Sequence, residues 1–134
     1  MKAGLIAWAG ALVALLVLDG VWLGWLMRDF VQQRLGPLML DKPNFVAAAM
    51  FYLVYAVGIW FFAIRPVAPD DGWTRAALLG AALGFIAYAT YDLTNTATLK
   101  NWSIQFSVVD LLWGTFATAV AASAGIALSR AFGD

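Results

Sequence analysis

The chain has no cysteine and no histidine among its 134 residues, and all eight of its acidic residues are aspartates. The lack of cysteine excludes disulfides, thiolate chemistry and iron–sulfur clusters, and it removes most zinc sites. The lack of histidine removes the commonest proton carrier at neutral pH and the usual haem ligand. Acid–base chemistry would therefore need carboxylates, tyrosines or lysines, and a metal would need oxygen ligands alone.

Charge is scarce as well, because 12% of the residues are charged, against about 25% in a typical soluble domain. The formal net charge is zero and there is no basic tract, so nucleic acid is not an expected partner. Hydrophobic residues make up 63% of the chain. They occur in runs of about 20 residues, which is enough for a helix to cross a hydrocarbon core of about 30 Å. The composition predicts an integral membrane protein whose first partners are membrane lipids.

Four apolar segments are bounded by charge, proline or glycine, at residues 4–27, 44–64, 74–99 and 102–128. The first follows Lys2 as in a signal peptide, but it is long and has no convincing cleavage site, so we expect it to be retained. Short connections favour antiparallel neighbours. We therefore predict an all-α fold, a single transmembrane domain that forms an antiparallel up-down four-helix bundle.

Four spans would place both termini on one side of the membrane, called side A here, and the long connection 28–43 on the opposite side B. Lysines and arginines divide four against four between the sides, so the positive-inside rule does not orient the protein. The start of the long connection is predicted to extend the first helix out of the membrane. Gly36 and Pro37 should end that extension.

Small residues recur four apart in three of the segments, a spacing that lets another helix backbone approach closely. The first segment has Gly20 and Gly24, and the third has Gly80 and Gly84. The fourth offers a longer stripe. Two interpretations stay open: packing seams within the chain, which we favour, or a homodimer face. The stripe in the fourth segment is formed by Ala117, Ala121 and Gly125.

Three aspartates, Asp19, Asp92 and Asp110, fall inside the first, third and fourth segments. An aspartate at a helix centre costs about 2.5–3.5 kcal/mol on insertion scales, so three that face lipid would cost roughly 8–10 kcal/mol. We therefore predict that all three face the interior of the bundle. At about 1.5 Å per residue, each lies about 11–13 Å from side B, so the carboxyl groups should share one layer.

Aromatic and amide side chains recur at helical spacing around these aspartates. Trp22 and Trp113 each follow an aspartate by three residues, and residues three or four apart share a helix face. Tyrosines of the second segment reach the same depth. The residues predicted to bind a ligand or ion are Asp19, Asp92, Asp110, Asn95, Trp22, Trp113, Tyr52, Tyr55, Tyr88 and Tyr91.

No lysine or arginine lies at this depth in any segment. Carboxylates a few ångströms apart in a low dielectric cannot all stay ionised, so a shared proton or a bound cation is predicted. A metal variant would add oxygen ligands from Asn95 and from Thr94 or Thr98, but a metal needs ligands about 2.0–2.6 Å away. We expect neither a metal nor a cofactor. The plainer alternative is that the carboxyls only hold the helices together by hydrogen bonds.

The stretch "YDLTNTATLKNW" (residues 91–102), followed by "DLLWG" (residues 110–114), resembles a family of uncharacterised bacterial membrane proteins, the domain of unknown function family 2177. The resemblance covers essentially the whole chain. It implies a four-helix membrane architecture and a bacterial source, and so a multi-pass protein of the bacterial inner membrane. It implies no activity.

Three functions stay open on the residues. The first is binding or translocation of a proton, a cation or a small ligand by the aspartate and aromatic layer, because rings and a carboxylate together suit an organic cation. The second is an intramembrane acid–base enzyme acting on a lipid or isoprenoid. The third is an accessory or structural subunit. Toward side A, Thr118 and Ser123 are the only polar side chains of the last two segments that we expect could continue a polar route, which favours a pocket open to one side.

Overall fold

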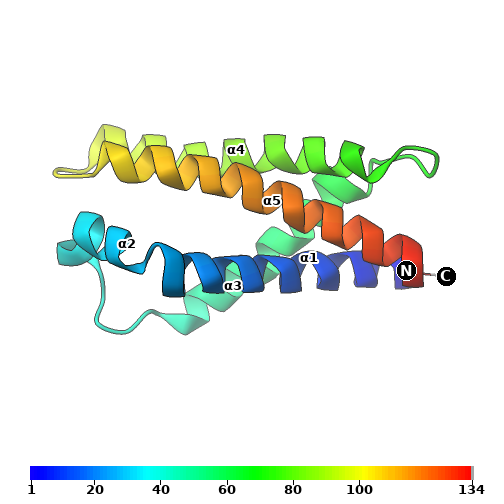
Figure 1. Ribbon diagram of the computed structural model, residues 1–134, viewed down its shortest axis with the longest axis horizontal. Helices are drawn as coiled ribbons and strands as arrows, with labels where there is room; N and C mark the ends of the chain where they lie inside the picture. The colour runs from blue at the N-terminus through cyan, green and yellow to red at the C-terminus, as the bar shows by residue number, and fades with distance from the viewer. Residues whose placement is uncertain (134) are drawn as a thin grey trace.

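The computed structural model describes residues 1–133, and this part of the chain is helical with no strand. Four helices are long and apolar enough to cross a membrane, and Figure 1 places the two termini at the same end of the molecule. The prediction of an all-α membrane protein with four spans is confirmed. The spans are Lys2–Leu26, Phe45–Ile64, Trp73–Thr98 and Ile104–Phe132.

The first two spans are each an α-helix that ends in one π-helical turn. The first consists of α1 (Lys2–Val21) and η1 (Trp22–Leu26), and the second of α3 (Phe45–Ile59) and η3 (Trp60–Ile64). The other two spans are continuous helices, α4 (Trp73–Thr98) and α5 (Ile104–Phe132). Single π turns occur frequently at functional sites, and η1 directly precedes the connection to side B.

Side chains at the helix starts explain where two of the spans begin. The Asn44 side chain accepts a hydrogen bond from the backbone N–H of Ala47 (3.1 Å), and Ser103 Oγ accepts one from Phe106 (3.0 Å). Each satisfies an N–H that the first helical turn leaves unpaired. Between α4 and α5, Asn101 has a φ of 61°, a conformation that asparagine tolerates better than most residues. The turn therefore brings α5 back along α4, and the two lie side by side (Figure 1).

The long connection on side B begins with α2 (Arg28–Leu35) and continues in a 3-10 turn, η2 (Gly36–Leu38). Met27, with φ −113° and ψ 11°, separates α2 from the first span. The helical extension and its end at Gly36 and Pro37 are thus confirmed. Val31 is the buried residue of α2.

Gly80 and Gly84 form a packing seam against α5. A Cβ atom at Gly80 would lie 2.8 Å from the carbonyl oxygen of Thr118 and 2.8 Å from the Cβ of Ala122, and one at Gly84 would collide with the carbonyl oxygen of Gly114. Only glycine permits the two backbones to come this close. On α5, the stripe of Ala117, Ala121 and Gly125 is buried, and Gly125 lies against α1.

The pair Gly20 and Gly24 behaves differently, since a Cβ atom at either position would meet nothing within 4 Å. The predicted seam within the chain is wrong for this pair. The buried face of α1 runs through Ala7, Ala11, Leu15 and Asp19 at intervals of four, and Gly20 is turned about 100° away from that face. A homodimer through these glycines stays a prediction.

The apolar core fills the half of the bundle toward side A, and it is built largely of small residues. Its members are Ala7, Ala11, Leu15, Ile59, Ala63, Ile64, Ala76, Ala121, Ala122 and Ile126. Large apolar side chains such as Phe85, Ile86, Leu112 and Phe116 are exposed instead. This distribution is expected where lipid, and not water, surrounds the helices. The half toward side B is packed differently and contains the site.

Candidate functional site

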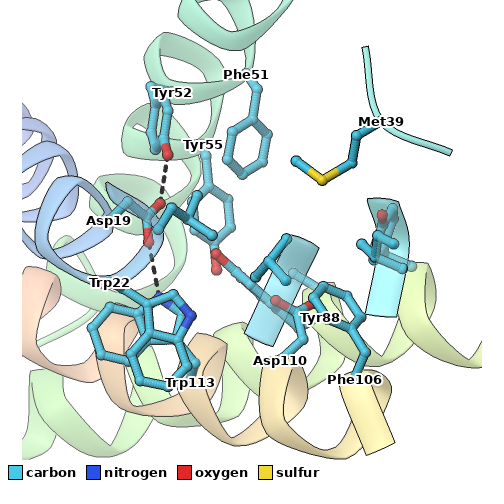
Figure 2. Close-up of a pocket in the computed structure, with 15 residues that line it drawn as sticks. Asp19, Trp22, Met39, Phe51, Tyr52, Tyr55, Tyr88, Phe106, Asp110 and Trp113 are labelled. Atoms are coloured by element: carbon cyan, nitrogen blue, oxygen red, sulfur yellow. Dashed lines mark hydrogen bonds between the residues drawn. The ribbon is translucent and has the colours of Figure 1, made fainter. Parts of the chain in front are cut away.

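A cavity of about 530 Å³ lies between the helices in the half toward side B, within the range of roughly 300–1,000 Å³ for small-molecule sites. Figure 2 shows its aromatic side chains and two carboxyl groups facing a common space. The cavity is lined by Asp19, Trp22, Leu23, Val31, Leu35, Met39, Phe51, Tyr52, Tyr55, Ala87, Tyr88, Tyr91, Phe106, Asp110 and Trp113.

Helical spacing explains why these residues converge. On α3, Phe51 and Tyr55 are four apart and their rings stack with centroids 5.2 Å apart. On α5, Asp110 lies four residues after Phe106 and three before Trp113, so one face of that helix lines the cavity. Gly114 makes space for Tyr88, because a Cβ atom at this position would collide with the Tyr88 ring.

Asp19 is the best-connected acid of the site. Its carboxylate accepts hydrogen bonds from the Tyr52 hydroxyl (2.5 Å) and from Trp113 Nε1 (2.8 Å) (Figure 2). The residue is 7% exposed. The bonds connect three of the spans. Trp113 stacks on Trp22, with centroids 4.1 Å apart and planes 6° apart. Both donors are neutral, so they stabilise the carboxylate without cancelling its charge.

Asp92 and Asp110 form a second acidic centre. Asp92 is 1% exposed and lies behind the cavity wall, while Asp110 belongs to the wall. Asp110 lies one turn after Ser107 on α5, and the Ser107 hydroxyl donates to the backbone carbonyl of Asp92 (3.4 Å), so the two aspartates lie at the same level of the packed helices α4 and α5. A hydrogen bond between their carboxyl groups requires a proton on one of them, because two ionised carboxylates have no hydrogen to share.

Tyr55, which lines the cavity, shares a hydrogen bond with the hydroxyl of Thr118, 2.7 Å away and outside the cavity lining. Thr118 is fully buried. Ser123, the other residue predicted to continue a polar route toward side A, donates to the carbonyl oxygen of Ala119 in its own helix (2.8 Å). Beyond Thr118 the buried residues are the small apolar ones of the core. The cavity therefore ends in the middle of the bundle.

The side-B connection supplies part of the wall that sequence analysis missed. Val31, Leu35 and Met39 line the cavity, and Figure 2 shows Met39 facing the Phe51 ring. These three residues recur every four positions, which is the signal that could have identified them. Phe51 and Phe106 were also missed, although each lies four residues from a predicted site residue.

Most of the predicted site residues line this one cavity, and Asp92 and Asn95 are the exceptions. Asp92 is buried at the level of Asp110, whereas Asn95 is half-buried nearer the end of α4. Among residues 1–133, no group of three or more acidic side chains is placed to hold a metal ion. The three aspartates thus form one hydrogen-bonded carboxylate and one carboxyl pair.

A second hollow of about 530 Å³ lies between α1 and α3 near the N-terminus and is lined by Met1, Gly4, Leu5, Trp8, Val57 and Trp60. No acidic side chain lines it. The side-B cavity is therefore the better candidate for chemistry.

Comparison with known proteins agrees with the architecture. None of the curated proteins and none of the solved structures matches the chain. The family model described as "Predicted membrane protein (DUF2177)" matches residues 4–127, which is nearly the whole chain. The protein therefore belongs to this family of predicted membrane proteins, whose function is unknown.

Proposed function

We propose that this protein binds a small organic cation with an apolar body in the side-B cavity, as a multi-pass protein of the bacterial inner membrane. The observation that carries the proposal is the Asp19 carboxylate, which receives two hydrogen bonds from neutral donors at the wall of an aromatic cavity. The described residues that line this cavity include no lysine or arginine. A negative charge is thus held in the cavity with no fixed positive partner.

The walls suit the same kind of ligand. The rings of Trp22, Tyr55 and Trp113 border the cavity, and a cation over an aromatic face gains about 0.5–2 kcal/mol, more when water is excluded. Leu23, Leu35 and Phe106 offer apolar surface to the rest of the molecule. The hydrogen bond from Tyr55 to the fully buried Thr118 closes the way toward side A, which supports binding and argues against an open channel.

The experiment is a titration of the purified protein in detergent with benzyltrimethylammonium, followed by tryptophan fluorescence and calorimetry. The neutral isostere neopentylbenzene serves as the ligand control. We expect the cation to bind and Asp19→Asn to weaken it at least about tenfold, which corresponds to about 1.4 kcal/mol. Asp29→Asn, which removes an exposed charge of α2 outside the cavity, should bind like wild type. Equal binding of both ligands would overturn the proposal.

A structural role for Asp19 has its own support, because its two bonds join α1, α3 and α5. Tyr52→Phe separates the two roles: it removes one hydrogen bond to a charged group, about 1.5–3 kcal/mol, but keeps the carboxylate. If Asp19 acts as the counter-charge, Tyr52→Phe should melt at a lower temperature and still bind the cation. If Asp19→Asn lowers only the melting temperature and leaves binding intact, Asp19 has a structural role and is not the counter-charge of the ligand.

A further inference from the structure

Asp92 is a buried residue whose carboxyl group has no hydrogen-bond donor among the described residues. Neither carboxyl oxygen receives a hydrogen bond from an N–H or O–H group of residues 1–133. The nearby hydroxyls are bonded elsewhere: Thr96 and Ser107 donate to the backbone carbonyl of Asp92 (2.7 and 3.4 Å), and Trp102 donates to Ser107 (2.7 Å). A carboxyl that merely held helices together would use these donors.

The acidic neighbour of Asp92 is Asp110, which lies one turn after Ser107, the residue whose hydroxyl donates to the Asp92 carbonyl. Leaving a buried carboxylate without a donor costs several kcal/mol, and two facing carboxylates would add repulsion. One proton placed between them removes both costs, since one carboxyl then donates to the other. Asp110 lines the cavity while Asp92 does not, so the pair reaches from the buried wall to the ligand space.

The groups around the pair cannot replace that proton. The titratable side chains that face it are Tyr88 and Tyr91 on α4 and, across the cavity, Asp19 on α1 and Tyr52 and Tyr55 on α3. All of these are neutral or negative. The connection adds Val31, Leu35 and Met39, which are apolar. A positive charge can therefore come to the pair only as a proton or as a ligand.

We propose that Asp92 and Asp110 hold one proton between them and that an organic cation entering the cavity displaces it, so that the site exchanges a cation for a proton. The inference rests on the cation binding proposed above. The O–H bond of the pair breaks, the proton leaves for water on side B, and the electron pair stays on the carboxylate beside the cation. One positive charge enters as one leaves, so the net charge of the cavity does not change.

The exchange has a measurable consequence. When one proton is released for each cation bound, the affinity rises about tenfold per pH unit over the range in which the pair is protonated. Benzyltrimethylammonium is a suitable probe because it has no proton of its own. In Asp92→Asn the amide N–H can donate to Asp110, so the pair no longer needs a proton, and binding should lose this pH dependence.

The test measures proton release during benzyltrimethylammonium binding between about pH 5 and pH 9, a range that covers strongly perturbed carboxyls. Calorimetry in buffers of different ionisation enthalpy gives the number of protons. We expect about one per cation for wild type at the acidic end and none for Asp92→Asn. Asp29→Asn, a charge removed outside the cavity, should release protons as wild type does.

Infrared spectroscopy tests whether the pair holds a proton, and this test does not depend on the affinity of any variant for the cation. The ligand-free wild type should show a protonated-carboxyl band that saturating cation removes, and the double variant Asp92→Asn/Asp110→Asn should lack it. If the cation binds without proton release at every pH, or if the band persists when the site is full, the exchange is overturned and the proposed binding stands. If the cation binds at no pH, both are overturned.

Discussion

At the scale of single residues, Gly114 allows the Tyr88 ring to pack at the cavity wall. A methyl group at this position would collide with the Tyr88 ring, so Gly114→Ala requires that ring, which lines the cavity, to shift. We expect a loss of about 1–3 kcal/mol in stability, as for other overpacked sites, and weaker benzyltrimethylammonium binding. Thermal melting and titration measure the two effects.

Gly20→Ala is the matched control for Gly114→Ala, because its methyl group would meet nothing within 4 Å. Alanine is better than glycine inside a helix by roughly 0.5–1 kcal/mol, so this variant should be as stable as wild type or slightly more stable. If the two variants melt at the same temperature, the close contact between Gly114 and Tyr88 does not exist in the membrane protein.

Much of the site was predictable residue by residue, because two constraints act together. The cost of an aspartate in lipid requires Asp19 and Asp110 to face inward, and a spacing of three or four brings Trp22 and Trp113 to the same faces. What these rules omit is rotation about each helix axis. That rotation places Asp92 behind the wall and leaves Asn95 outside the cavity, and it depends on how closely Gly84 lets α5 approach.

At the scale of elements, α2 differs from the spans because it contributes one apolar stripe to the cavity wall. Leu35→Ala removes most of one apolar side chain that lines the cavity. The lost apolar contact should weaken the bound cation by about 1–2 kcal/mol, mainly through faster dissociation. Stopped-flow fluorescence measures the rate. Gln33→Ala, at an exposed neighbouring position outside the cavity, should leave the rate unchanged.

The ends of the helices were predictable from the sequence where a capping side chain or a Gly-Pro pair sets them. Asn44 and Ser103 cap the helices that follow, and α2 ends at Leu35, just before Gly36 and Pro37. The two π turns were not readable, because their apolar residues fit an α-helix equally well and only packing against neighbouring helices decides between the two. The prediction of a seam within the chain at Gly20 and Gly24 was wrong for a related reason: spacing identifies a possible seam but not whether a helix of the chain packs against it.

At the scale of the whole molecule, the two halves of the bundle differ in packing. Toward side B lies the cavity, whereas toward side A the described helices pack through alanines and glycines with Thr118 as the last buried polar group. Moving a charge through that apolar half without polar partners would cost several kcal/mol or more. Proteoliposomes should therefore show no proton or benzyltrimethylammonium conductance under an imposed membrane potential, as read with an internal pH dye for protons and a cation-selective electrode for benzyltrimethylammonium. A conductance that grows with protein content, and that Asp110→Asn abolishes, would mean that the packed half opens and that the site is part of a transport path.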